Sequence, residues 1–82
     1  MRGVSPTVTL YHREGCHLCE TVLEGLGALQ ERLDFSIQAV DIDTDPALRE
    51  RFGLKIPVVA VGEEILCCHR LDVAALEDAL AP

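Results

Sequence analysis

Two cysteines with two residues between them, Cys16 and Cys19, are the side chains of this sequence best suited to chemistry. They follow an alternating apolar stretch over residues 7–11, and they open an amphipathic stretch over 18–33 in which Leu and Val recur every three or four residues. The pair is therefore predicted to stand where a strand turns into a helix. Unpaired backbone N–H groups and the positive end of the dipole favour a thiolate at a helix N-terminus. We expect Cys16 to be reactive and Cys19 to form a reversible disulfide with it.

The amino-acid composition and net charge exclude some classes of function. With 82 residues, 49% of them hydrophobic, the chain is expected to form a single domain over residues 1–82 with a loose lead-in over 1–6. Fourteen acidic against seven basic residues, a net charge of −7 and no Lys/Arg run argue against a nucleic-acid partner. No apolar run reaches the roughly 18 residues of a membrane span, and the first residues lack a signal-peptide core. We therefore expect a cytoplasmic protein without a membrane partner, in which a C-x-x-C pair indicates redox or metal chemistry.

The remaining pattern predicts the element order βαβαββα. Asp45-Pro46 supplies a helix cap followed by proline at the first helical position, Gly62-Glu63-Glu64 is a hairpin signal, and Asp72 caps a last helix. The βαβ opening requires a parallel pair, and the hairpin adds antiparallel strands. We predict an α/β fold with a mixed four-stranded sheet flanked by helices. The strands are expected at 7–11, 35–41, 57–61 and 65–68, and the first helix at 16–32.

In this order the residues resemble the thioredoxin superfamily and, within it, the glutaredoxins and small bacterial glutaredoxin-like proteins. The resemblance covers nearly the whole chain. It includes Ile56-Pro57 at the opening of the third strand, where the superfamily keeps a cis-proline. The resemblance implies a thioredoxin-like fold and a cis bond that lies against the Cys16 sulfur, with backbone groups of Ile56 free to pair with a substrate peptide. The alternative is an ordinary trans proline at a strand start.

The resemblance also implies a thiol–disulfide oxidoreductase with a redox-active disulfide. Cys16 would attack a protein or small-molecule disulfide and Cys19 would resolve the mixed disulfide, with a reductase or glutathione as electron donor and no bound cofactor. An imidazolium at His17 would stabilise the Cys16 thiolate further. A solvated histidine without such a role is the alternative.

Binding of glutathione as a co-substrate depends on positions outside the C-x-x-C pair. Arg13 matches the position where glutaredoxins carry a Lys near the thiolate and the glutathione carboxylate, and Asp72 matches the Asp that binds the γ-glutamyl amine. The family's Gly-Gly pair before the last helix, however, falls on Cys68-His69. Glycines there allow close backbone approach to the tripeptide. The bulkier side chains are expected to obstruct glutathione despite Arg13 and Asp72.

The same segment motivates a different class of function. The fourth strand is expected to return to the C-x-x-C end of the sheet, carrying Cys67, Cys68 and His69 with it. Cys16 and Cys19 together with Cys68 or His69 could close a tetrahedral zinc site or hold an iron–sulfur cluster, which would make the protein a non-enzymatic metal-binding module. Successive strand residues point to opposite faces, so at most one of Cys67 and Cys68 is expected to face the site. A third possibility is an adaptor whose disulfide is structural.

Overall fold

The strands and helices follow one another in the predicted order. In the computed structural model, residues 5–81 are described, so most of the lead-in expected over 1–6 lies outside the described residues. A one-turn 3₁₀ helix, η1, adds an element that the sequence pattern did not predict. The elements are β1 (Thr7–His12), α1 (His17–Leu29), β2 (Ser36–Asp41), η1 (Ile42–Thr44), α2 (Pro46–Phe52), β3 (Val58–Val61), β4 (Glu64–Cys68) and α3 (Val73–Leu80).

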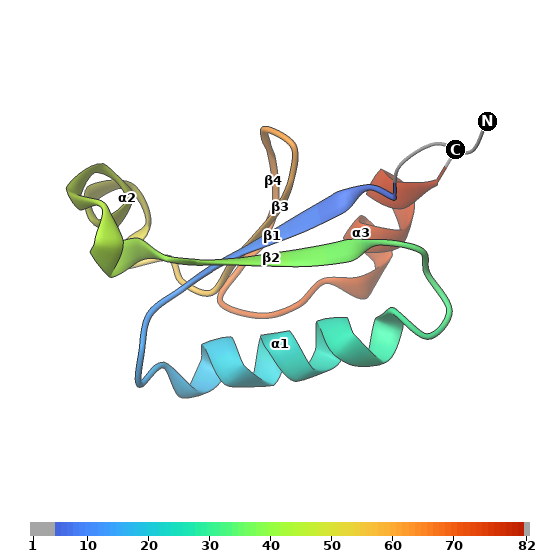
Figure 1. The fold of residues 1–82 in the computed structure, drawn as a ribbon, viewed down its shortest axis with the longest axis horizontal. Coiled ribbons are helices and arrows are strands. Elements are labelled where there is room, and N and C mark those ends of the chain that lie inside the picture. Colours follow the sequence, from blue (N-terminus) through green and yellow to red (C-terminus); the bar gives the residue numbers. More distant parts are fainter. Residues whose placement is uncertain (1–4, 82) are drawn as a thin grey trace.

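The strands within residues 5–81 form one mixed sheet in the order β2-β1-β3-β4 (Figure 1). Strands β1 and β2 are parallel, whereas β3 is antiparallel to both β1 and β4. In one row across the sheet, Tyr11 lies opposite Val58, and Val58 lies opposite Cys68. The end of β1, the start of β3 and the end of β4 therefore share one edge of the sheet, which is the edge where α1 begins.

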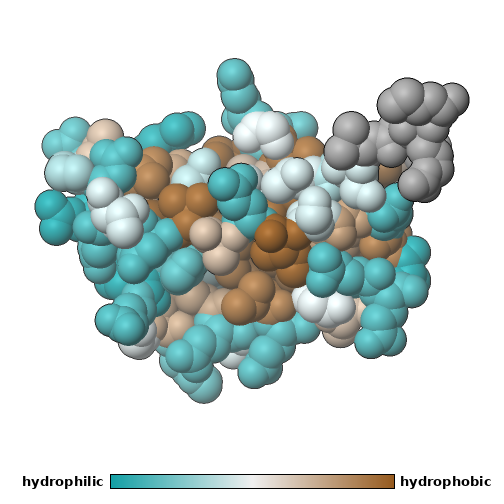
Figure 2. Space-filling view, viewed as in Figure 1, coloured by the Kyte–Doolittle hydropathy of each residue, from teal (hydrophilic) through white to brown (hydrophobic). Residues whose placement is uncertain are grey.

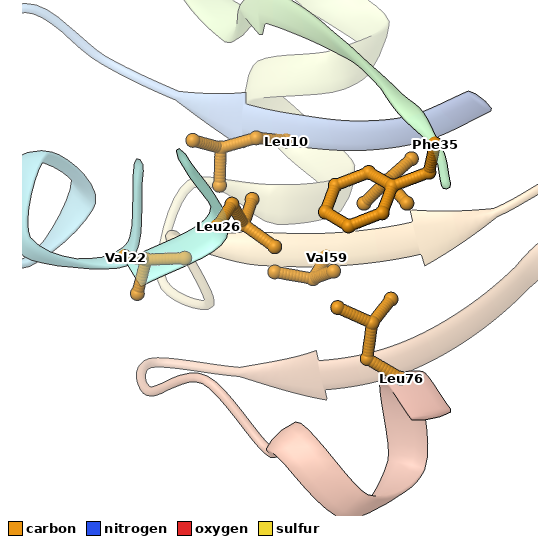
Figure 3. Close-up of a cluster of buried hydrophobic side chains, with 7 residues drawn as sticks. Leu10, Val22, Leu26, Phe35, Val59 and Leu76 are labelled. Carbon is orange, nitrogen blue, oxygen red and sulfur yellow. The ribbon is translucent and has the colours of Figure 1, made fainter. Parts of the chain in front are cut away.

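Helices cover both faces of the sheet, as predicted. Helices α1 and α3 pack on one face around a main cluster, most of which is drawn in Figure 3. Helix α2 and η1 pack on the other face around a second cluster, where the Tyr11 ring stacks on Phe52 with centroids 4.5 Å apart. The buried residues of the main cluster are Val8, Leu10, Val22, Leu26, Phe35, Val59 and Leu76. Those of the second cluster are Ile42, Phe52 and Val58.

Helix α1 ends three residues earlier than the apolar periodicity predicted. The pattern continues to Leu33, which packs against the main cluster from the turns that follow the helix. Inside the helix, Gly25 provides room for a neighbour: a Cβ atom at this position would lie 3.0 Å from Leu71 Cδ2. The glycine lowers helix propensity by about 1 kcal/mol, but it allows Leu71 to approach α1. Among residues 5–81, each helix is too short or too polar to cross a membrane.

Candidate functional site

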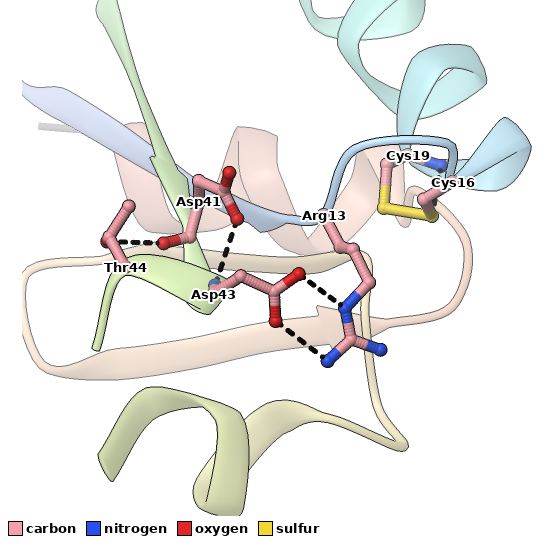
Figure 4. A network of polar contacts seen from close by, with 6 residues as sticks. All are labelled: Arg13, Cys16, Cys19, Asp41, Asp43 and Thr44. Carbon is pink, nitrogen blue, oxygen red and sulfur yellow. Dashed lines mark hydrogen bonds and ion pairs between the residues drawn. A yellow bond between two sulfur atoms is a disulfide. The ribbon is translucent and has the colours of Figure 1, made fainter. Parts of the chain in front are cut away.

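Cys16 is the N-cap residue of α1 and forms a disulfide with Cys19 (Figure 4). The Cys16 sulfur also accepts a hydrogen bond from the Cys19 backbone N–H, with the two atoms 3.1 Å apart. Gly15, directly before the cap, has a φ of +80°, a left-handed conformation that glycine adopts without steric cost. The turn thus places the Cys16 sulfur among the N–H groups at the start of the helix, as predicted.

The two residues of the disulfide differ in their exposure to solvent. Cys19 is only 4% exposed because it lies on the side of α1 that faces the sheet. Cys16 is half-buried at the start of the helix. A partner in solution can therefore reach the sulfur of Cys16 more readily than that of Cys19.

Arg13 is held by a carboxylate that no sequence motif connects with it. Its Nε and Nη2 donate to Asp43 Oδ2 and Oδ1 at 3.0 and 3.1 Å. Figure 4 shows the guanidinium directed toward Asp43 and away from the two sulfurs. Asp43 is positioned by η1, in which its own N–H donates to Asp41 Oδ1 at 2.9 Å and Thr44 Oγ1 donates to the Asp41 carbonyl at 2.7 Å. At the site, the positive charge of Arg13 is therefore balanced by the negative charge of Asp43.

His17 points into solvent. Its side chain is 90% exposed, and its Nδ1 lies 4.0 Å from Glu20 Oε1 one helical turn further on. The Glu20 carboxylate is thus the ionic neighbour of the His17 imidazole in the structure. The expected effect of His17 on the Cys16 thiolate stays a prediction.

The segment before β3 lies at the same edge of the sheet as Cys16. The Ile56–Pro57 peptide bond is cis, Pro57 is fully buried, and Ile56 packs against the second cluster. The Pro57 carbonyl accepts a hydrogen bond from the His69 N–H at 2.7 Å. The contact of Pro57 with the Cys16 sulfur, which the resemblance implies, stays a prediction.

His69 has the backbone conformation of a glycine but carries an imidazole. Its φ is +71°, and its Nε2 lies 3.0 Å from the Leu54 carbonyl oxygen. Three residues later, Asp72 caps α3, with Oδ1 accepting from the Ala75 N–H at 3.0 Å. The turn after β4 is therefore left-handed at His69, and the imidazole of this residue links it to the loop before β3.

Residues 5–81 do not bring the alternative metal ligands together in this structure, in which Cys16 and Cys19 form a disulfide, and metal binding stays a prediction. Cys68 packs into the second cluster, whereas Cys67 packs against the main cluster on the opposite face of the sheet. Because β4 alternates, Cys68 points away from the face that α1 covers. Within residues 5–81 no group of three or more His, Cys, Asp or Glu side chains is placed to hold a metal ion. The alternative set comprises Cys16, Cys19, Cys68 and His69.

Cys67 is a thiol in an apolar setting. Burial raises the pKa of Cys67 above the ordinary cysteine value. The Asp72 N–H, which donates to the Cys67 sulfur at 3.4 Å, acts against this rise. A raised pKa keeps the thiol protonated near neutral pH, so this sulfur is a poor nucleophile.

A cavity of about 260 Å³ lies beside the disulfide. Both cysteines contribute to its wall, together with apolar side chains from β1, α1 and β2 and with charged residues of the turn before α1. Leu23 and Ala39 were not predicted as site residues, because each lies on an exposed part of its element and no motif includes them. The full lining is Leu10, His12, Arg13, Glu14, Gly15, Cys16, Cys19, Glu20, Leu23 and Ala39.

A mixed four-stranded sheet with helices on both faces and a C-x-x-C disulfide at the first helix defines a thioredoxin-like α/β fold. Among solved structures, that of a mutant thioredoxin from Halobacterium salinarum is similar to this chain, with a TM-score of 0.62 at 20% sequence identity. The match covers 90% of this chain and 70% of the thioredoxin. At this identity the likeness concerns the fold alone.

The family model of the Glutaredoxin-like domain (DUF836) matches residues 7–81. The chain therefore belongs to this glutaredoxin-like family. The solution NMR structure of protein Ne2328 from Nitrosomonas europaea is 30% identical, with a TM-score of 0.85 over 99% of both chains. The X-ray structure of protein XcR50 from X. campestris is 32% identical, with a TM-score of 0.71, and the match covers 92% of this chain and 99% of that one.

Proposed function

We propose that this protein is a thiol–disulfide oxidoreductase that exchanges electrons with disulfide substrates through Cys16 and Cys19. The observation that carries the proposal is the disulfide at the N-cap of α1. Its more accessible sulfur accepts a backbone N–H bond, and this bond together with the helix dipole favours a thiolate in the reduced state. A thiolate, rather than a thiol, is the nucleophile of disulfide exchange.

In the proposed reaction, the reduced protein transfers two electrons to its substrate. The Cys16 thiolate attacks one sulfur of a substrate disulfide, and the other half of the substrate leaves as a thiolate. Cys19 then loses its proton and attacks the Cys16 sulfur, which breaks the mixed disulfide and releases the second substrate thiolate. The Cys16–Cys19 disulfide remains, and a thiol donor restores the dithiol by the reverse steps.

Contacts around the site support a protein dithiol, such as that of a reductase, over glutathione as the donor. The guanidinium of Arg13 is already paired with Asp43, so a glutathione carboxylate would have to compete with this carboxylate. An imidazole stands at His69, where the resemblance expects glycine. The Ile56 N–H donates to the Phe52 carbonyl oxygen at 3.1 Å. The Ile56 carbonyl group, next to the cis bond, is therefore the proposed partner of a substrate peptide.

The test is the pKa of the Cys16 thiol in the reduced, metal-free protein. Thiolate absorbance in the ultraviolet is followed against pH, with the Cys16→Ser variant as the control that assigns the signal. We expect a Cys16-dependent pKa below the value of about 8.5 for a free cysteine. A pKa at or above that value would contradict the proposed nucleophile.

A further inference from the structure

The cavity beside the disulfide has an apolar wall built from elements far apart in the sequence. Leu10 of β1, Leu23 of α1 and Ala39 of β2 line it together with the two cysteines. Leu23 is 42% exposed and Ala39 is also exposed, so the cavity is open to solvent. Figure 2 shows hydrophobic side chains gathered on this face of the molecule, between β2 and α1.

The volume of the cavity limits what it can hold. Pockets for whole small molecules measure about 300–1,000 Å³, whereas this cavity measures about 260 Å³. It is therefore suited to one apolar side chain of a larger substrate. Because Cys16 and Cys19 form part of its wall, a side chain seated there belongs to a residue close to the reacting sulfur of that substrate.

The rim of the cavity is acidic. Glu14 and Glu20 are exposed carboxylates. Arg13 is the one Lys or Arg among the described residues of the lining, and its charge is matched by Asp43. The net charge of the protein, −7, also attracts cations and repels anions. A cationic group at the rim is thus attracted, whereas an anionic substrate such as glutathione disulfide is repelled.

We propose that this cavity is a substrate subsite, which accepts the apolar side chain of a peptide whose reacting cysteine is flanked by that residue and by a lysine or arginine. The inference rests on the proposed function and names its substrate class. A residue held in the cavity keeps the substrate sulfur next to Cys16. Binding of this non-reacting side chain therefore accelerates the attack on the peptide disulfide.

The experiment measures how fast the reduced, full-length protein attacks mixed disulfides between capped tripeptides and thionitrobenzoate. Attack of the Cys16 thiolate on the peptide sulfur releases the coloured thionitrobenzoate anion, which is the same for every peptide. Four peptides are compared: Lys-Leu-Cys, Lys-Gly-Cys, Glu-Leu-Cys and Glu-Gly-Cys. The rates of the Cys16→Ser variant are subtracted to remove reaction at the other cysteines.

We expect the Leu peptides to react about tenfold faster than the Gly peptides, because the Leu side chain leaves water on binding. The Lys peptides should react about two- to fivefold faster than the Glu peptides at low ionic strength, and added salt should reduce this preference. Replacing both rim carboxylates, Glu14→Gln with Glu20→Gln, should weaken the preference for Lys.

Two variants test the cavity itself. Ala39→Leu, on the edge strand β2, fills the cavity and should remove the roughly tenfold advantage of the Leu peptides over the Gly peptides. Leu23→Ala removes part of the apolar wall and should also reduce the preference for Leu, without adding bulk. Ala28→Leu is the matched control, because Ala28 is exposed on α1 and does not line the cavity.

Equal rates for the Leu and Gly peptides with the unmodified protein would overturn the subsite, as would an Ala39→Leu variant that slows both peptides equally. Hydroxyethyl disulfide, which is small and uncharged, separates this failure from a failure of the proposed function. If it is reduced in a Cys16-dependent way while the peptides show no preference, only the subsite is wrong. If neither it nor any peptide reacts through Cys16, the proposed function fails and the subsite fails with it.

Discussion

The two cysteine pairs of this chain lie at one edge of the same sheet, yet their backbones give them different chemistry. Cys16 and Cys19 stand one helical turn apart with their Cα atoms separated by 5.2 Å, a distance that suits a disulfide. Cys67 and Cys68 are neighbours in β4, and their side chains enter the clusters on opposite faces of the sheet. The spacing of two cysteines has chemical meaning only together with the element that carries them.

The surroundings of the sulfurs increase this difference. Cys16 is half-buried, and its sulfur accepts a hydrogen bond from a backbone N–H at a helix N-terminus. Burial raises the pKa of Cys67, and the apolar contacts of Cys68 are with the second cluster. The first pair is thus suited to exchange, and the second pair serves as small core residues.

The strongest test of this comparison is the loss of exchange activity in cysteine variants. Cys16→Ser should reduce the rate of hydroxyethyl disulfide reduction about 100-fold or more, because the nucleophile is removed. Cys67→Ala and Cys68→Ala, the matched controls from the other pair, should change the rate less than about twofold. A Cys16→Ser variant that keeps most of the rate would show that the second pair performs the chemistry.

Most of the fold could be predicted because its signals are local. Alternating apolar residues mark the strands, and Asp45-Pro46 and Asp72 mark the starts of α2 and α3 where the structure has them. The predicted end of α1 was wrong because periodicity reports burial rather than helix: Leu33 is in contact with the core from a turn. η1 was missed because a single 3₁₀ turn has no period of its own.

The site was also predicted only in part, because only some of its contacts are local in sequence. The position of Cys16 at the N-cap follows from adjacent residues, so the sequence shows it. The Arg13–Asp43 pair joins residues separated by 30 positions, and the cavity joins Leu10, Leu23 and Ala39 from different elements. Such contacts depend on how the elements pack, and the sequence pattern has no signal for them.

The second prediction concerns the reactivity of the half-buried Cys67 thiol. In the native, reduced protein near pH 7, Cys67 should react with iodoacetamide about tenfold more slowly than a free cysteine, because a raised pKa lowers the thiolate fraction and burial restricts access. Cys16 should react faster than Cys67 at the same pH. Mass spectrometry of the alkylated peptides measures both sites in one sample.

The control is the same reaction in concentrated urea, where the environments of the two thiols become alike and their rates should converge. A native Cys67 that reacts as fast as a free cysteine would remove the distinction between the two pairs. The oxidised protein offers a further check, because Cys16 and Cys19 should then be protected while Cys67 remains a thiol.

The third prediction tests whether the end of β4 has a structural role. His69→Ala should lower the free energy of unfolding by about 1 kcal/mol, because the contact with the Leu54 carbonyl is lost while the left-handed backbone remains. His69→Gly loses the same contact but removes the steric cost of the positive φ. It should therefore be about 1 kcal/mol more stable than His69→Ala. Urea denaturation measures both values, and equal stabilities would contradict a left-handed conformation at this residue.

The smallest expected effect is the pH dependence of stability that Cys67 contributes. Because its pKa is higher in the folded than in the unfolded protein, folding favours the protonated thiol. The stabilisation is complete below the unfolded value of about 8.5 and is lost as the pH rises through the folded pKa. The free energy of unfolding of the reduced protein should thus fall as the pH rises above about 8.5. Cys67→Ala should reduce this fall, whereas Cys68→Ala, the control on the other face of the sheet, should retain the contribution of Cys67. If the fall is unchanged in Cys67→Ala, the apolar setting of this sulfur does not influence its titration, and the contrast with Cys16 depends on the helix N-terminus alone.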